Sequence, residues 1–262
     1  MPRYLTFALV APLASFGAIA VGERRSGWDR PARSAVLGLI GACLGLERED
    51  DAGQDALASG YAVALLCHSP GRLLADYHTT QVPSAKRGRR FATRAEELDF
   101  PSHELNTILS RRDYRSGAWH LGAISLRHDA TRWTLEDLAA AMREPRFVPC
   151  LGRKSCPLGL PLSPQISDAA DASAALLERH RSGPEGWLKA PGGRTLRGVL
   201  ADPPVATIIV VDADTIKPDD ADTIEPGDPR HYRTEFRRDQ PRSRRRWQFD
   251  LRAEAVLGTE TP

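Results

Sequence analysis

The chain has 262 residues, of which 41% are apolar and 27% charged, so it can bury the core of one large or two small globular domains. Its formal net charge is only +2, which by itself indicates no particular partner. The charges are nevertheless segregated: residues 86–94 carry five cations and no acid, 212–228 carry seven acids and one lysine, and 230–252 carry nine arginines and three acids. Two basic runs of this kind are typical of nucleic-acid binding, although each alone is also compatible with a solvated surface face.

The first predicted element is a strand over about residues 3–10. The cation and apolar run of MPRYLTFALV, with Ala18-Ile19-Ala20 further on, also resemble a signal peptide. The β-favouring residues of YLTFALV and the proline at position 12 favour a strand. We therefore interpret this segment as part of the fold rather than as a leader.

An uncharged stretch, Ala35 to Leu46, follows and is too short to span a membrane. It predicts a buried helix over Ser34–Leu46. Cations precede this helix, where the helix dipole disfavours them. We therefore predict that Arg30, Arg33 and Ser34, together with the free backbone N–H groups of the first turn, bind a phosphate from outside the chain.

The rest of the chain alternates strand and helix patterns around one long polar segment. Pro70-Gly71 lies between two short apolar runs and indicates a hairpin. The polar, basic segment 78–116 is longer than an ordinary loop, which is typical of a functional or a disordered segment. The predicted elements are strands at Tyr61–Cys67, Arg72–Tyr77, Trp119–Leu126, Val205–Val211 and Trp247–Val256, a helix capped by Thr134 and ending before Pro145, a glycine- and proline-rich loop at 149–164, and an alanine-rich helix from Ser167 to Arg181.

The opening β-α-β-β order with a later helix and strand predicts an α+β, ferredoxin-like domain over residues 1–150. Residues 151–262 then form a smaller, less regular β-rich part.

Within it, DADTIKP at 212–218 recurs as DADTIEP at 220–226, which predicts a solvated acidic loop over 212–228. A calcium loop would need a glycine and a terminal glutamate that are missing. Scattered histidines and four cysteines without zinc spacing predict no metal or cofactor and a reduced, cytoplasmic protein.

Six segments, read together, resemble one protein family across nearly the whole chain. They are YLTFALVAPLASFG, RPARSAVLGLIGACLGLER, LLADYHTTQ, TILSRRDYRSGAWHLGAI, EPRFVPCLGRKSCPLGLPL and RRDQPRSRRRWQFDLRAEAV. The sequence resembles the CasD family of CRISPR-associated proteins, which are subunits of the type I-E Cascade complex in the repeat-associated mysterious protein superfamily. The acidic repeat at 212–226 departs from the family pattern.

The resemblance implies an RNA-recognition-type, ferredoxin-like domain with an inserted thumb at about 78–116 and a glycine-rich loop. It also implies a non-catalytic subunit that binds the 5′ handle of CRISPR RNA, caps the backbone filament and touches the large subunit that inspects target DNA. Its partners would be CRISPR RNA, the filament and large subunits, and target DNA held by the complex, with no membrane. Matched to this sequence, the RNA-binding residues are Gly152, Arg153, Lys154 and Ser155 in the loop and His78, Arg87, Arg89 and Arg90 in the thumb.

Two other functions stay open at this point. A metal-independent endoribonuclease needs a base, an acid and a cation at one phosphate, and the candidates are Tyr77, His78, Lys86 and His103. The chain has no adjacent Lys-His pair, so the non-catalytic role is preferred. A free-standing RNA-binding domain is the third possibility. Without the family resemblance, the loop at 152–155 would be interpreted as a plain turn held by Pro157.

Overall fold

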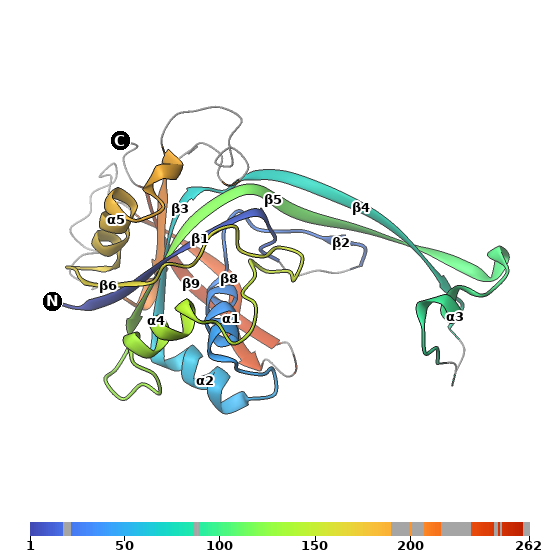
Figure 1. Ribbon diagram of the computed structural model, residues 1–262, viewed down its shortest axis with the longest axis horizontal. Helices are drawn as coiled ribbons and strands as arrows, with labels where there is room; N and C mark the ends of the chain where they lie inside the picture. The colour runs from blue at the N-terminus through green and yellow to red at the C-terminus, as the bar shows by residue number, and fades with distance from the viewer. Residues whose placement is uncertain are drawn as a thin grey trace.

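A computed structural model describes residues 1–17, 22–85, 88, 90–189, 200, 207–215, 232–243, 246 and 248–258 (Figure 1). Lys86, Arg87, Arg89 and the acidic repeat beyond residue 215 lie outside this part of the chain. The helices and strands are β1 Arg3–Ala14, β2 Arg24–Arg25, α1 Arg33–Leu44, α2 Asp51–Gly60, β3 Tyr61–Ser69, β4 Arg72–Pro83, α3 Arg94–Leu98, η1 Ser102–Glu104, β5 Leu105–Leu126, α4 Leu135–Arg143, β6 Gln165–Asp168, α5 Ala172–Ser182, η2 Gly186–Lys189, β7 Ile208–Asp212, η3 Ala213–Thr215, β8 Tyr232–Ser243 and β9 Gln248–Gly258.

The described strands form one sheet in the order β6-β1-β5-β3-β7-β9-β8, with β2 and β4 also paired to β5. Apart from the short β2, neighbouring strands run antiparallel. The predicted α+β class is therefore confirmed. The likeness to a ferredoxin-like domain is confined to the β-α-β-β-α-β succession of β1, α1, β3, β5, α4 and β6. The sheet continues through β7, β9 and β8 across the domain boundary predicted at residue 150.

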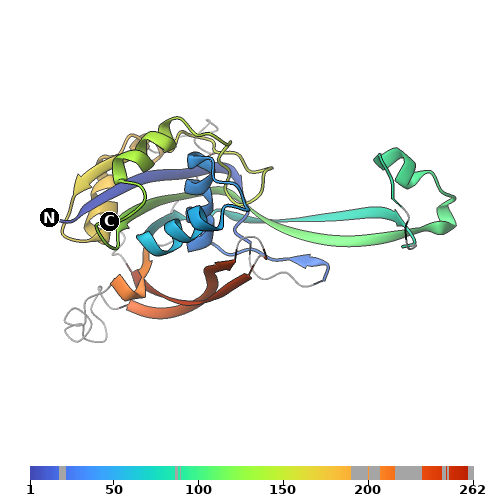
Figure 2. The same ribbon diagram turned by 90° about the horizontal axis from the view of Figure 1, so that it is seen from below.

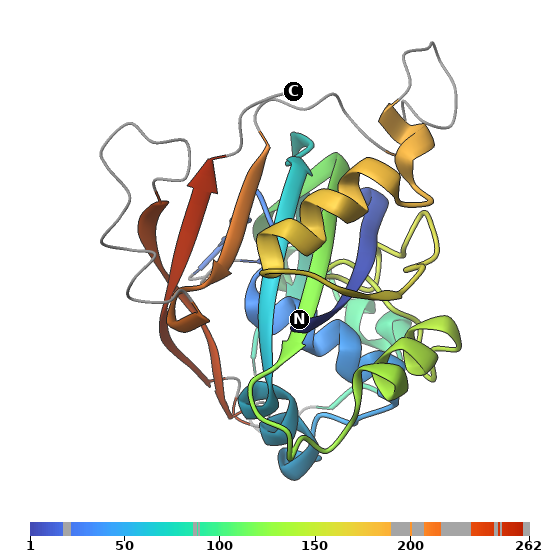
Figure 3. The same cartoon turned by 90° about the vertical axis from the view of Figure 1, so that its left-hand side faces the viewer.

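The core has two layers, one on each face of the sheet. Because successive strand residues point to opposite faces, Leu5, Phe7 and Leu9 of β1 pack beneath α1 and α4, whereas Ala8 and Val10 pack on the α5 side. Tyr4 and Phe7 of β1 are both buried. In Figure 3, α5 crosses the central strands, and in Figure 2, α1 and α2 lie between those strands and the β8–β9 hairpin. The sheet thus curls around α1.

Two histidines lie between α5 and the sheet. His68 Nδ1 of β3 and His180 Nε2 of α5 are 2.9 Å apart, and the His68 ring packs on Trp119 at 4.1 Å between centroids. Burial, with smaller contributions from neighbouring cations, lowers the pKa of each histidine to about 4. Both rings are therefore neutral at pH 7, and one N–H between them donates to the other ring.

The predicted hairpin at Pro70-Gly71 is wrong. β3 and β4 both pair with β5 in nearly continuous register, from Tyr61 opposite Leu126 to Pro83 opposite Leu105. The chain cannot fold back on β3 because the other edge of β3 already pairs with β7. Gly71 has a φ of +69° and instead connects β3 to β4, which follow one another along β5. The pairing register of β3 with β5 shifts just before this point.

The thumb is a two-stranded ribbon formed by β4 and the first half of β5, and it projects far from the sheet (Figure 1). Most of its side chains are exposed, which explains why the sequence looked like a long polar loop. The tip carries α3 and a contact of the Phe91 and Phe100 rings, whose centroids are 5.9 Å apart. The segment predicted as an insertion at 78–116 covers the distal part of β4, the tip and the β5 side of this ribbon down to its root.

Two further predicted helices can be compared with α4 and α5 of the structure. Thr134 caps α4 with a full capping box, as predicted. The helix predicted to begin at Ser167 begins at Ala172 under an Asp171 cap, because 165–168 pairs with β1 as β6. No local pattern predicted α2, which has few apolar residues, or β8, which is rich in arginine.

The predicted external phosphate site at the start of α1 is wrong, because carboxylates of the chain itself occupy that place. Asp239 Oδ2 of β8 accepts the Arg33 backbone N–H at 2.8 Å, in the position of a helix cap. The Arg33 side chain is 2% exposed and its Nε donates to Asp212 Oδ2 at 3.1 Å. Its other guanidinium nitrogens donate to Gln240 Oε1 and to the carbonyl oxygens of Ala58 and Tyr61.

Arg30 is buried in the same way, so neither arginine presents a cation to solvent. Its Nη2 donates to Glu254 Oε1 at 2.6 Å and to Glu235 Oε2 at 2.5 Å. Burial lowers the pKa of Arg30, but these hydrogen bonds outweigh it and the pKa is raised. We call the whole set the entrance cluster; its members are Arg30, Arg33, Arg127, Arg237, Arg252, Asp212, Asp214, Glu235, Asp239 and Glu254.

Asp212 lies at the centre of the entrance cluster. Its carboxylate accepts from Arg33, from Arg127 Nη2 at 2.7 Å and from Arg252 Nη1 at 3.0 Å, and it also accepts the Val63 backbone N–H. Asp212 is buried, so the prediction of a solvated acidic loop is wrong for this residue. The calcium alternative is also unsupported here, since no group of three metal-binding side chains occurs within the described residues.

We predict that Asp212→Ala lowers the free energy of unfolding by about 3–5 kcal/mol, because it leaves buried guanidinium groups short of a counter-charge. Urea unfolding followed by circular dichroism measures this. Asp250→Ala is the matched control, since Asp250 is exposed and 4.0 Å from Arg242, and it should cost no more than about 1 kcal/mol. Equal effects of the two substitutions would contradict a structural role for the entrance cluster.

Candidate nucleic-acid interface

The root of the thumb gathers cations from two segments that are distant in sequence. β2 pairs in parallel with β5, placing Arg24 beside Arg111 and Arg25 beside Arg112. All four side chains are exposed. Two acids lie nearby: Asp113 is buried and lies 3.9 Å from Arg111 Nε, and Asp76 pairs in register with Arg112. Because successive strand residues point to opposite faces, Arg24 and Arg111 lie on one face of the ribbon base and Arg25 and Arg112 on the other, so each face carries two cations suited to a polyanion.

The glycine-rich loop is attached to this root by its backbone. Gly152 has a φ of +94°, and a Cβ at this position would overlap the carbonyl oxygen of Ser15 at the end of β1. The Ser15 N–H donates to the Leu151 carbonyl, and the Leu151 N–H donates to the Cys156 carbonyl. Glycine is therefore required at 152 for the loop to lie this close to β1.

The loop places a cation on an aromatic ring of β5. The Arg153 guanidinium carbon lies 4.6 Å from the centre of the Tyr114 ring, and Arg153 Nη1 donates to the Asp113 carbonyl at 3.4 Å. Lys154 and Ser155 are exposed next to it. The geometry presents a flat, positively charged surface at the junction of β1, β5 and the loop.

A pocket of about 320 Å³ opens beside Tyr114. It is lined by Leu13, Leu74, Ala75, Asp76, Tyr77, Tyr114 and Ser155. Tyr77, another lining residue, is 63% exposed, so an aromatic ring is open to solvent at the rim. Asp76 also pairs with His78 Nδ1 at 3.0 Å across the rim. Aromatic rings, a hydroxyl and a carboxylate of this kind suit an unpaired nucleobase.

The structure brings together only part of the predicted set. Gly152, Arg153, Lys154 and Ser155 lie at the thumb root, with His78 on the adjoining ribbon. The exposed Arg90 lies in the thumb tip, away from the root, whereas Arg30 and Arg33 are buried in the entrance cluster and Ser34 lies in the first turn of α1. Arg87 and Arg89 lie outside the described residues.

Sequence reasoning missed the main cations and rings of the root. These are Arg24, Arg25, Arg111, Arg112, Tyr77 as an aromatic wall, and Tyr114. The signal that was available is the basic run SRRDYRS at 110–116, which has three arginines and one acid. The pairing of β2 with β5 had no local signal.

The residues considered for ribonuclease chemistry do not converge. Tyr77 lies six residues before Pro83, the end of β4, which corresponds to about 20 Å along a strand. His103 lies beyond that end, in η1. His78 follows Tyr77 directly and so points to the other face of the ribbon. Lys86 is outside the described residues.

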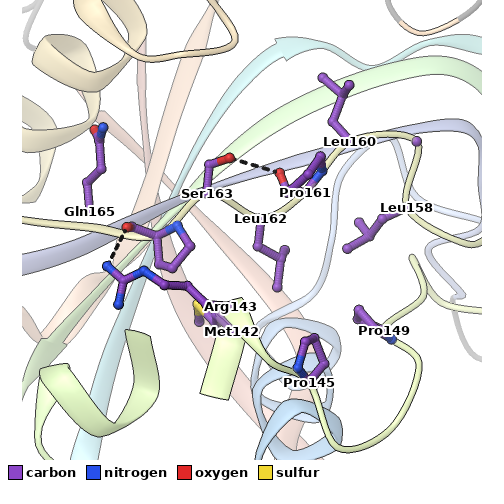
Figure 4. Close-up of a pocket in the computed structure, with 12 residues that line it drawn as sticks. Met142, Arg143, Pro145, Pro149, Leu158, Leu160, Pro161, Leu162, Ser163 and Gln165 are labelled. Atoms are coloured by element: carbon purple, nitrogen blue, oxygen red, sulfur yellow. Dashed lines mark hydrogen bonds between the residues drawn. The ribbon is translucent and has the colours of Figure 1, made fainter. Parts of the chain in front are cut away.

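A second, larger pocket lies between the end of α4 and the segment 158–165 (Figure 4). Proline and leucine side chains dominate its lining, and Arg143 is its one charged lining residue. Arg143 Nη2 donates to the Pro164 carbonyl at 3.3 Å, as drawn in Figure 4. This pocket offers no acid–base pair to a substrate.

Comparison with known proteins shows the family of the chain. The family described as CRISPR-associated protein (Cas_Cas5) matches residues 4–252. The chain belongs to this family. Over 217 residues, covering 79% of this chain and 91% of the relative, it is 31% identical to the "CRISPR system Cascade subunit CasD" of Escherichia coli (strain K12).

Solved structures show a similar fold. A chain of a "CRISPR RNA-guided surveillance complex" superposes with a TM-score of 0.61 at 22% identity, covering 99% of this chain and 91% of the other. A structure described as "Crystal structure of Cas protein" gives 0.52 at 22% identity, covering 97% and 95%. In the described part of this chain, no helix is both long and apolar enough to cross a membrane.

We predict that Gly152→Ala lowers the free energy of unfolding by at least about 1–3 kcal/mol, because alanine is strained at this positive φ and its methyl group would displace the loop from Ser15. Amide exchange of residues 151–156 should also accelerate. Gly186→Ala is the control, since its Cβ would meet nothing within 4 Å and its φ is not in the left-handed region. If Gly152→Ala unfolds and exchanges like the control, the loop is not held by this contact.

Proposed function

We propose that the chain is a non-catalytic, RNA-binding subunit of a CRISPR RNA-guided surveillance complex, binding the 5′ handle of CRISPR RNA at the thumb root and capping the backbone filament. Membership of the family supports this role, as does 31% identity to a Cascade subunit. The partners proposed are the CRISPR RNA, the filament and large subunits and, in the assembled complex, target DNA.

The observation that carries the proposal is the convergence at the thumb root. The Gly152 loop, β2, β4 and β5 bring cations, two tyrosines and a pocket together from four separate parts of the chain. A strand of RNA needs this combination, because its phosphates bind cations while its unpaired bases stack on rings. A protein partner alone would not explain four neighbouring exposed arginines in a two-stranded register.

Different residues of the thumb root suit the phosphates and the bases of the RNA. The pairs Arg24–Arg111 and Arg25–Arg112, on opposite faces of the ribbon base, suit phosphates. A base can enter the pocket and lie against Tyr77, with Ser155 and Asp76 available to its polar edge. The entrance cluster takes no part, because its arginines are neutralised inside the fold.

Filament capping needs a surface for protein, and the ribbon offers one. Leu73 and Ile108 are large apolar side chains that are about half exposed on the thumb. Apolar side chains exposed on a projecting ribbon are suited to contact with neighbouring subunits. The thumb therefore combines a nucleic-acid surface at its root with an apolar surface along its length.

We predict that Tyr77→Ala and Arg153→Gln each weaken binding of handle RNA, Tyr77→Ala by about tenfold, because the first removes a ring that lines the pocket and the second removes the cation over Tyr114. Fluorescence anisotropy with a labelled handle RNA measures the affinity. Ile108→Ala is the matched control, since Ile108 is exposed on the same ribbon but outside the pocket. Unchanged affinity in both pocket variants, with Ile108→Ala failing to assemble, would mean that the thumb binds only protein.

The enzymatic alternative has a direct test. Incubated with its repeat RNA in EDTA, the protein should leave the RNA intact on a denaturing gel, because its described candidate groups do not meet at one phosphate. A single cut at the base of the handle, abolished by His78→Ala or His103→Ala, would show a nuclease and contradict the non-catalytic role.

A further inference from the structure

The β8–β9 hairpin has two different faces. Along its inner face Arg237, Asp239 and Glu254 are buried in the entrance cluster against α1. Successive residues point the other way, so Phe236 and Arg238 of β8 and Leu251 of β9 lie on the outer face. In Figure 2 the hairpin is the outermost layer beyond α1 and α2. The basic run that the sequence shows at 230–252 is thus divided between the interior and this surface.

Large apolar side chains are unusually exposed on the outer face. Phe236 is 67% exposed and Leu251 is 59% exposed. In the register of the hairpin Phe236 lies opposite Ala253, and Leu251 lies opposite Arg238. The small Ala253 side chain leaves the Phe236 ring uncovered on that side. An aromatic ring held on a rigid sheet and exposed to this extent is suited to stacking on a planar ligand.

Exposed arginines lie along the hairpin; they are Arg233, Arg238, Arg242 and Arg246. Arg238 lies on the same face as Phe236, two residues further along β8. The described acids near them are Glu235, which is bonded to both Arg30 and Arg233, and Asp250, which lies 4.0 Å from Arg242. Arg238 therefore gives the outer face a positive charge beside Phe236. Charge complementarity favours a polyanion on this surface.

We propose that the outer face of the β8–β9 hairpin, centred on Phe236, binds single-stranded nucleic acid. Unpaired bases stack on the Phe236 ring while phosphates contact the neighbouring arginines, the arrangement by which sheet surfaces bind single strands. A base pair inside a duplex has no free face for the ring, so duplexes bind less tightly. A protein partner fits less well, because Arg238 interrupts the two apolar side chains. This surface shares no residue with the thumb root and does not depend on the handle site.

The experiment measures anisotropy of labelled U12, dT12 and a 12-base-pair duplex with the full chain carrying Tyr77→Ala and Arg153→Gln, so that the thumb root contributes little. In this background we expect Phe236→Ala to weaken single-strand binding by fivefold or more. Phe236→Tyr should retain binding and Phe236→Leu should not, because stacking needs the ring. The U12 and dT12 arms show whether the surface prefers RNA or DNA. Arg238→Gln should lower the slope of log affinity against log salt by about 0.7.

Trp187→Ala is the matched control, since Trp187 is a partly exposed aromatic residue in η2, and it should change nothing. Thermal unfolding confirms that each variant is folded, which is expected at an exposed site. Equal single-strand affinity of wild type and Phe236→Ala overturns the proposal. Restored binding in Phe236→Leu also overturns it, since plain apolarity then suffices. Loss of subunit assembly with unchanged nucleic-acid affinity would assign the face to a protein partner instead.

Discussion

Asp212 and Asp239 meet Arg33 at the first turn of α1, although they follow it in the chain by 179 and 206 residues. This contact closes the curl of the sheet, because it ties β7 and β8 to the helix that the sheet surrounds. An apolar helix with cations at its N-terminus is unfavourable alone, since the dipole and the guanidinium groups repel each other. The carboxylates of the entrance cluster remove that conflict and cap the helix.

A buried cluster of this kind specifies a structure more than it stabilises one. Removing charges from water costs several kcal/mol for each ion, and well-paired geometry offsets most of that cost. We infer that the cluster selects one position for the C-terminal strands relative to α1. The inner face of the hairpin is committed to that role, which leaves only its outer face for other contacts.

The thumb root depends on a second constraint, the length and continuity of β5. Its 22 residues pair with β1 and β3 in the sheet and with β4 in the ribbon, so the base of the thumb is rigidly joined to the core. Tyr114 lies where these pairings change over. Gly152 then lets the loop approach the end of β1, and Arg153 comes to lie over Tyr114. Rigid placement of rings and cations reduces the entropy lost when a flexible strand binds.

The helices and strands that were predicted correctly are those whose pattern lies within a few consecutive residues. The β-favouring residues of β1, the uncharged run of α1 and the Thr134 cap each identified an element. The family resemblance, confirmed by comparison, identified the loop at 152–155. The predictions that were wrong concerned structure that depends on pairing between segments distant in sequence. Pro70-Gly71 is compatible with a hairpin until the other edge of β3 is known to be occupied.

Two arginines, Arg33 and Arg153, show most clearly that the sequence does not reveal contacts between distant residues. Arg33 and Arg153 are both cations beside a glycine-bearing segment, and sequence alone assigned both to phosphate. One meets Asp212 inside the fold, whereas the other lies over Tyr114 at the surface. A charge in a sequence does not reveal whether its partner is internal, because that depends on residues brought near it only by folding.

The central claim is that RNA contacts the thumb root and not the start of α1. Photo-cross-linking of the assembled protein with 4-thiouridine-substituted CRISPR RNA, followed by mass spectrometry of the adducts, tests it most directly. We expect adducts in peptides containing Tyr77, Tyr114 or residues 153–155, and none in peptides spanning 30–34. Adducts at 30–34 with the thumb root unlabelled would contradict the account.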